Sequence, residues 1–127
     1  MNMIDQAFGV HEQALALRSQ RMEVLARNIA NADTPHFKAQ DLDFKTMLKS
    51  AEETALGTTH GSHLPTDLTE QQNGLMFRVP FNVAFDGNTV ELAVEQAKYG
   101  QSAADYQATL SILENRISGI RKALRGD

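Results

Sequence analysis

The stretch LAVEQAKYGQSAADYQATLSILENRISGIRKAL, residues 92–124, decides the fold, because it holds no proline and repeats apolar side chains at alternating spacings of four and three residues. Such spacing places one stripe of side chains along a single face of an α-helix. The stripe comprises Leu92, Gln96, Tyr99, Ala103, Tyr106, Leu110, Leu113, Ile117, Ile120 and Leu124. Its large apolar members, which exclude Gln96 and Ala103, are called the C-helix seam below.

Turn and capping signals indicate where this helix starts. Asp86-Gly87 is a turn signal, and Asn88 followed three residues later by Glu91 resembles a capping box. We therefore expect the helix to begin near Thr89 and to reach Arg125. Residues 89–127 are accordingly predicted to form a C-terminal assembly helix.

Before the turn, apolar side chains occupy every second position from residue 75 to residue 85. They are Leu75, Phe77, Val79, Phe81, Val83 and Phe85. This alternation predicts an extended segment with one buried face. Pro80, on the other face, favours an edge position in a sheet.

The first part of the chain repeats the pattern of the last. An N-helix seam at the same spacing comprises Ile4, Phe8, Leu15, Met22, Leu25 and Ile29. His11 and Arg18 interrupt it, and two readings of Arg18 stay open: it fixes the register of a partner, or it extends along its own stem to water. Thr34-Pro35 ends the helix, because the residue before proline avoids the α region. Residues 1–33 are thus predicted to be an N-terminal assembly helix.

A second stripe, Val10, Leu17 and Val24, lies on the far side of this first helix. One partner helix cannot cover both sides, so we expect the two arms to be poorly ordered in the free monomer and to become ordered on assembly. Periodicity alone equally allows an ordinary helical bundle that a short helix at residues 42–54 completes. Residues 34–88, which contain all three prolines, form an irregular or extended middle region in either reading. The predicted fold is mainly α, with the two long helices paired as a coiled-coil-like hairpin.

Charge and composition exclude several classes of function. The net charge of −4 resides in residues 32–88, and no basic face of the kind that binds phosphate backbones is present, so we expect no nucleic-acid partner. The sequence contains neither a long apolar run nor a basic flank followed by an apolar segment, so no cleaved signal peptide is expected.

Candidate catalytic and metal-binding groups are few. His60 and His63 supply at most two zinc ligands in a polar loop, where zinc sites need three or four. Asp41 with Asp43, or Glu52 with Glu53, could form a carboxylate pair, but nothing in the sequence places either pair in an apolar cleft. We therefore expect no enzyme activity, no cofactor and no small-molecule substrate.

The end of the first helix carries the most specific motif. The segment LARNIANADTPHFKA, residues 25–39, followed by DLDF at residues 41–44, resembles the signature of flagellar rod and hook-type axial proteins. The matching residues, called the assembly motif below, are Asn28, Ile29, Ala30, Asn31, Ala32, Thr34, Pro35 and Phe37. Asp86-Gly-Asn-Thr-Val90 before the last helix is most similar to subunits of the proximal rod. His36 departs from the pattern, because the family usually has glycine there.

The resemblance implies a structural subunit that polymerises through its terminal helices into a tube, which transmits torque and conducts exported subunits. It implies export through the flagellar type III apparatus and assembly in the periplasm-spanning rod of the basal body. The implied partners are further copies of the chain, other rod subunits, the ring-to-rod adaptor protein and the inner-membrane ring. From the residues alone, a soluble helical-bundle binding module remains the alternative.

Overall fold

The computed structural model describes residues 3–56 and 74–126, apart from the side chains of residues 3–7 and 53–56. The elements in chain order are α1 (Met3–Ala30), β1 (Gln40–Leu42), α2 (Phe44–Leu56), β2 (Leu75–Phe77) and α3 (Leu92–Arg125). The prediction of a mainly helical chain with long terminal helices and a short extended segment in its middle is confirmed. The short helix expected at residues 42–54 is α2.

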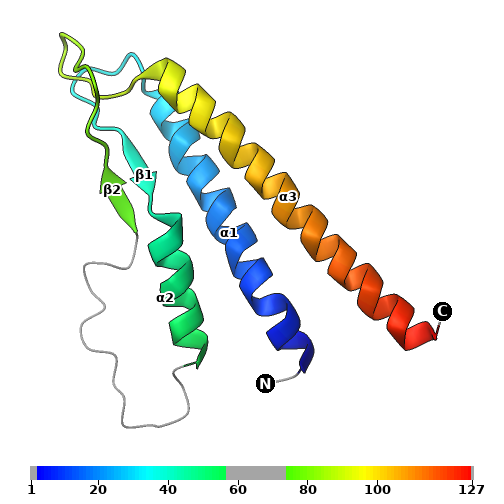
Figure 1. Ribbon diagram of the computed structural model, residues 1–127. Helices are drawn as coiled ribbons and strands as arrows, with labels where there is room; N and C mark the ends of the chain where they lie inside the picture. Colours follow the sequence, from blue (N-terminus) through cyan, green and yellow to red (C-terminus); the bar gives the residue numbers. More distant parts are fainter. Residues whose placement is uncertain (1–2, 57–73, 127) are drawn as a thin grey trace, which may run out of the picture.

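The helices form an open layer in which α1 lies between α2 and α3 (Figure 1). Asn28 of α1 contacts Glu95 of α3, and Arg18 of α1 contacts Asp105 of α3. The two helices therefore run antiparallel, with the same number of residues between the two contacts on each helix. Across the described ranges, α2 packs on α1 but does not touch α3. The helices therefore do not close into the three-helix bundle that the periodicity also allowed.

The apolar core of the described residues is small. Its buried side chains are Ala14, Val24, Leu25, Ala39 and Leu42. Three of them, Ala14, Val24 and Leu25, belong to α1, and Ala39 and Leu42 lie at or beside β1, which packs on that helix. Among the helices that the structure describes, none has both the length and the apolar character needed to cross a bilayer.

The two short strands pair antiparallel, with Gln40 opposite Phe77 and Leu42 opposite Leu75. No helix in the described part of the chain packs on β2. The prediction of a buried face between residues 75 and 85 is therefore wrong for the single chain. We call this segment the apolar ribbon; its exposed members are Leu75, Met76, Phe77, Val79, Phe81, Val83 and Phe85. Pro80 lies beyond the end of β2, in irregular backbone.

Helix α3 begins at Leu92, three residues later than expected. Its N-cap, Glu91, makes no side-chain capping hydrogen bond, so the capping box predicted from Asn88 and Glu91 is wrong. The reason is that the Asn88 carboxamide binds the end of α1 instead, while the Glu91 carboxylate accepts a hydrogen bond from the Phe81 N–H. At its other end, α3 stops at Gly126 in the left-handed conformation.

The turn after Pro35 adopts the conformation that a glycine would favour. His36 has a φ of 59°, and it is the non-glycine residue with positive φ among those described. Its ring lies against Gly87, which itself has a φ of 79°. A Cβ added to Gly87 would come within 2.8 Å of the His36 Nδ1 atom. A side chain at residue 87 would therefore force the His36 ring to move.

Replacing His36 with glycine should raise the free energy of unfolding by up to about 1 kcal/mol, because a positive φ is unfavourable for a residue with a Cβ atom. Gly87→Ala should lower it by more than about 1 kcal/mol, through its own positive φ and the contact with His36. Urea denaturation of the dilute chain measures both changes. His36→Ala keeps the Cβ and serves as the control; an equal gain from alanine would contradict this explanation.

Candidate functional site

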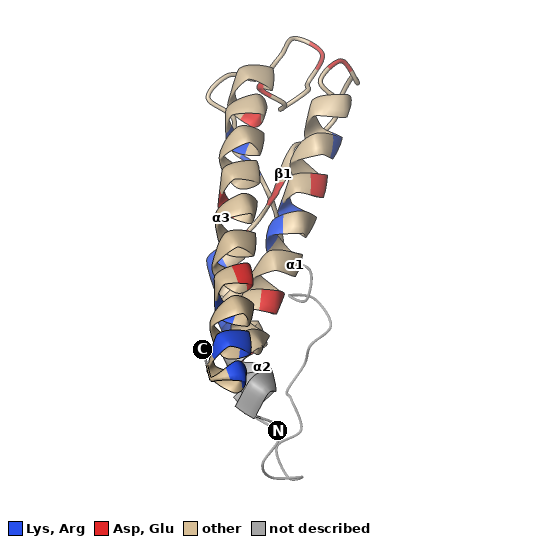
Figure 2. Ribbon diagram, turned by 90° about the vertical axis from the view of Figure 1, so that its right-hand side faces the viewer, with Lys and Arg blue, Asp and Glu red and all other residues tan. Residues whose placement is uncertain are grey.

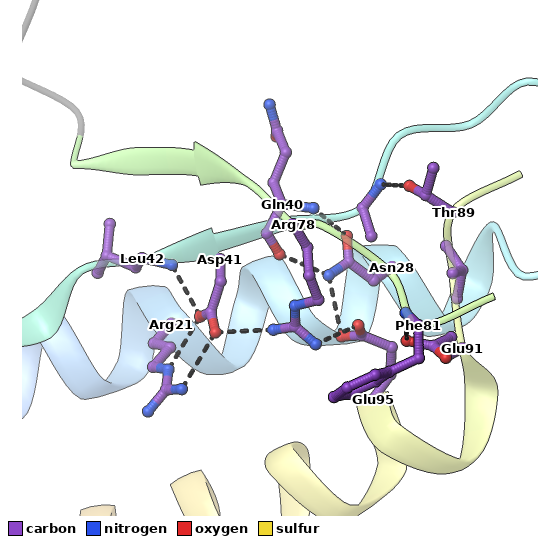
Figure 3. A network of polar contacts seen from close by, with 12 residues as sticks. Arg21, Asn28, Gln40, Asp41, Leu42, Arg78, Phe81, Thr89, Glu91 and Glu95 are labelled. Carbon is purple, nitrogen blue, oxygen red and sulfur yellow. Dashed lines mark hydrogen bonds and ion pairs between the residues drawn. The ribbon is translucent and has the colours of Figure 1, made fainter. Parts of the chain in front are cut away.

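Five polar side chains from four segments of the chain meet where α1 ends and α3 begins (Figure 3). We call this group the junction cluster. Arg21 and Asn28 come from α1, Asp41 from β1, Arg78 from the residue after β2, and Glu95 from the first turn of α3.

Asn28 joins α1 to the sheet and to α3. Its Nδ2 donates to the Gln40 carbonyl at 2.6 Å and to the Glu95 Oε2 atom at 3.0 Å. Its Oδ1 accepts a hydrogen bond from the Gln40 N–H at 3.1 Å. The side chain is buried, so this uncharged amide satisfies polar groups of two other elements without the desolvation of a further ion.

Arg78 lies between two carboxylates. Its Nη1 donates to Glu95 Oε1 at 2.5 Å, and its Nη2 donates to Asp41 Oδ2 at 2.7 Å. Arg21 binds the same Asp41 carboxylate through Nε at 3.0 Å and Nη2 at 3.2 Å. Two cations thus balance two anions, and the Glu95 side chain has no solvent exposure. A buried carboxylate requires such pairing, because the isolated charge would be strongly destabilising there.

The electrostatics of Asp41 follow from these contacts. Burial alone would raise the pKa of Asp41, but the hydrogen bonds from Arg21 and the Leu42 N–H, with the charges of Arg21 and Arg78, outweigh it and hold the pKa below 3.8. The hydrogen bond to Asp41 raises the pKa of Arg21 in return. Both groups therefore remain charged at neutral pH.

Asn88 completes the C-terminal end of α1. Its Nδ2 donates to the carbonyls of Asn31, Ala32 and Thr34 at 2.8 to 3.0 Å, and these carbonyls belong to the turn that follows the helix. Its Oδ1 accepts a hydrogen bond from the Val90 N–H at 2.7 Å. Helix ends leave carbonyls without intrahelical partners, and a buried side chain from 50 or more residues later supplies the donor here.

The assembly motif surrounds this junction. Asn28 is buried, Ile29, Asn31, Ala32 and Phe37 are half-buried, and Ala30, Thr34 and Pro35 are exposed. Asn31 donates to the Arg27 carbonyl and accepts from Thr34 Oγ1, which closes the turn. The Phe37 carbonyl accepts the Thr89 N–H, so the segment leading to β1 is held against the segment leading to α3. Both Asn28 and Asn31 of the motif thus form hydrogen bonds to backbone groups.

The two predicted seams lie differently in the structure. On α1, Leu25 is buried and Phe8, Leu15, Met22 and Ile29 are half-buried, whereas the Ile4 side chain lies outside those described. On α3, the fully buried residues are the polar Glu95, Ser102 and Thr109, which repeat every seven residues. The C-helix seam lies beside that stripe. Its half-buried members are Tyr106, Leu110, Leu113 and Ile120, and its exposed members are Leu92, Tyr99, Ile117 and Leu124.

Arg18 fixes the relative positions of all three helices. Its Nη1 forms an ion pair with Asp105 of α3 at 3.0 Å, and its guanidinium carbon lies 4.4 Å from the centre of the Phe44 ring of α2. These contacts favour the register interpretation over extension into water, because the charged group is held by two neighbours.

Sequence reasoning missed Arg78, Glu95 and Asn88 as partners of the motif. A signal for Glu95 was present, since Glu95, Ser102 and Thr109 repeat with the period of a helix face. Arg78 is a lone charge in an otherwise uncharged run, which is a weaker signal. No local pattern indicates that Asn88 binds carbonyls of residues 31–34.

Of the candidate carboxylate pairs, Asp41 with Asp43 makes other contacts, and the Glu53 side chain of the second pair lies outside those described. No group of three or more His, Cys, Asp or Glu side chains that could hold a metal ion occurs in 3–56 and 74–126. Asp41 binds two arginines, and Asp43 accepts hydrogen bonds from Thr46 at the start of α2. His60 and His63 lie outside the described residues. The site that remains holds elements together.

The pH dependence of stability should report on Asp41. A carboxylate whose pKa is lowered by folding contributes stability that is present above its unfolded pKa of about 4 and is lost as the pH falls through the folded value. The free energy of unfolding should therefore decrease between about pH 5 and pH 2. Asp41→Asn should flatten this decrease and lower stability at pH 7, measured by urea denaturation at each pH. Equal slopes in the two proteins would contradict the assignment.

Asn88→Ala should lower the free energy of unfolding by about 1 to 2 kcal/mol, because the Ala32 carbonyl loses its donor and the Asn31 and Thr34 carbonyls each lose one of two donors. The matched control is Asn115→Ala, an exposed asparagine in α3, which should change stability by less than about 0.5 kcal/mol. Thermal or urea unfolding followed by circular dichroism at 222 nm, the usual helix signal, distinguishes the two. Equal effects would mean that Asn88 is not a cap.

Comparison with known proteins identifies the family of the chain. Residues 8–38, which contain most of α1 and the assembly motif, match the family described as flagella basal body rod protein. Flagellar basal body rod protein FlgB of Cereibacter sphaeroides is 42% identical over 120 residues, which cover 94% of each chain. The FlgB protein of Salmonella typhimurium is 37% identical over 99% of this chain and 98% of its own, and that of Escherichia coli K12 is 37% identical over 98% and 97%.

These relatives span nearly the whole chain, so the similarity includes both long helices and the segments that join them. Their names describe components of the flagellar rod and indicate no catalytic function. The resemblance found in the assembly motif is thereby confirmed. The chain belongs to the FlgB family of flagellar basal body rod proteins and is a structural subunit of that rod.

Proposed function

We propose that the chain polymerises through its two long helices into the tube of the proximal rod, which transmits torque and conducts exported subunits. The N-helix and C-helix seams carry the contacts between subunits in this proposal. The alternative, a self-contained helical binding module, would instead be complete as a single folded chain.

The proposal rests on the observation that α3 packs against the rest of its own chain through polar residues, whereas part of its apolar seam stays exposed. The buried residues of α3 are Glu95, Ser102 and Thr109, all of them polar. Meanwhile Leu92 and Ile117 of the C-helix seam remain 45% and 43% exposed. A stripe of large apolar side chains left in water is typical of a surface that a partner covers. The open layer supports the same conclusion, because α2 packs on α1 and not on α3 in the described residues, which leaves α3 with α1 as its one helical neighbour there.

The assembly motif has a positioning role in this function. Asn28, Asn31 and the Thr34-Pro35 turn hold the end of α1 at a set distance from β1 and from the start of α3. Packing in a helical tube requires both long helices to be presented in a constant relation. We infer that the motif maintains this relation, and that its exposed members also contact neighbouring subunits.

Further parts of the proposal concern partners and location. We infer contacts with copies of the chain, other rod subunits, the ring-to-rod adaptor, the inner-membrane ring and the flagellar export apparatus. We also infer export without signal cleavage and a position in the periplasm-spanning part of the basal body. Membership of the rod family supports these inferences.

Leu110→Asp and Ile117→Asp should each reduce incorporation into isolated basal bodies to less than about one tenth and abolish motility. The reason is that a charge buried at a subunit contact weakens it by more than about 1.4 kcal/mol. The circular dichroism of the dilute chain should change little, because Ile117 is exposed and Leu110 is only half-buried in the single subunit.

Asn115→Asp is the matched control, since it places the same charge on the same helix but away from the seam. It should leave incorporation near that of the unchanged protein. A large loss of helix in dilute Ile117→Asp, with normal incorporation of the folded fraction, would favour the binding module instead.

A further inference from the structure

The apolar ribbon has no cover within the described chain. Phe77, Phe81 and Phe85 are 70%, 91% and 114% exposed, and Val79 is 90% exposed. A phenylalanine side chain can bury roughly 150 to 250 Å², so three of them with the neighbouring valines provide an area close to the roughly 800 Å² per partner of a standard interface. Monomeric proteins rarely leave so much apolar side-chain area exposed within one short segment.

A second apolar surface, with Ile117 and Leu124 exposed and Leu113 and Ile120 half-buried, lies at the far end of the molecule. The ribbon belongs to the end where α1 stops and α3 starts, whereas α3 extends away from that end to Arg125 (Figure 1). Leu113, Ile117, Ile120 and Leu124 form the C-terminal patch of the C-helix seam, and Leu124 is 81% exposed. The chain therefore carries two different apolar surfaces at opposite ends.

The charges at the two ends are complementary. The loops beside the ribbon carry Asp33, Asp86 and Glu91 against Lys38. The last part of the chain has the opposite balance, with Arg116, Arg121, Lys122 and Arg125 against Glu114 and Asp127. Figure 2 shows this polarity, with acidic positions on the loops at one end and basic positions near the C-terminal end of α3.

We propose that the apolar ribbon of one copy of this chain covers the C-terminal patch of α3 in the next copy. Two different surfaces that bind each other make a heterologous contact, and repetition of such a contact produces an open helix of subunits instead of a closed dimer. The attraction between the acidic loops and the basic end of α3 sets the direction of the contact. This proposal rests on the proposed function. It gives the ribbon, which is not part of either helix seam, a role in the contact between subunits.

Disulfide formation between two singly substituted chains tests the proposal. The natural sequence contains no cysteine, so each introduced thiol is the only one in its chain. Phe81→Cys and Ile117→Cys are expressed together as the sole copies of the subunit, basal bodies are isolated and a mild oxidant is added. Dimers are counted on a non-reducing gel. Cysteines join only when their Cα atoms come within about 7 Å, so the proposal expects roughly tenfold more dimer than in the control pair.

The control pair is Phe81→Cys with Asn115→Cys, which displaces the second thiol around the same helix. If both chains enter the basal body and the two pairs give equal dimer, the ribbon does not cover the patch and this inference is wrong, while the rod function stands. If the unsubstituted chain itself fails to enter, both proposals fall. Crosslinks of the Phe81→Cys chain to a different rod protein would likewise overturn the assignment to a second copy.

A second measurement does not depend on cysteine chemistry. Phe81→Ser with Phe85→Ser should weaken self-association of the purified full chain in sedimentation experiments by more than roughly tenfold. Both side chains are exposed, so the helix content should not change. Reversal of Arg121 and Arg125 to glutamate should weaken association most at low salt, since screening removes the attraction at high salt. Unchanged association in both variants would overturn the proposal.

Discussion

The ion pair between Arg78 and Glu95 is the constraint on which the rest of the structure depends. Glu95 is fully buried where α3 crosses the end of α1, and an unpaired carboxylate there would be destabilising by several kcal/mol. Arg78 reaches that position only when β2 pairs with β1, because it directly follows β2. Packing of the last helix, pairing of the strands and the turn after the first helix are therefore linked through one buried charge.

This link explains why the chain turns a polar face of α3 inward. Ion pairs and amide bonds contribute little net stability, but they tolerate few alternative arrangements, because a shifted register would leave charges without partners. Arg18, Asp105 and Phe44 apply the same restriction farther along α1. The inner contacts thus define where the helices lie, and the large apolar side chains stay available for contacts outside the chain.

The sequence predicted those parts of the fold that depend on local signals. The alternating spacing and the Thr34-Pro35 boundary identify both long helices, and the motif around Asn28 identifies the family. The predicted start of α3 was wrong because Asn88 binds carbonyls of residues far away in the sequence, which no local capping rule takes into account. The prediction that one face of the ribbon is buried was wrong for another reason. Alternation indicates that one side of a segment is apolar, but it does not indicate which chain covers that side. Arg78 and Asp41 were missed as a pair because charge complementarity across a sheet has no linear signature.

The small core has a thermodynamic consequence. The heat capacity change of unfolding arises mainly from apolar surface that becomes hydrated. Ala14, Val24, Leu25, Ala39 and Leu42 bury little such surface in the described residues. The free subunit should therefore have a flat stability curve, which varies little between a cold and a warm environment, and gain strong temperature dependence only after neighbours bury its remaining apolar side chains.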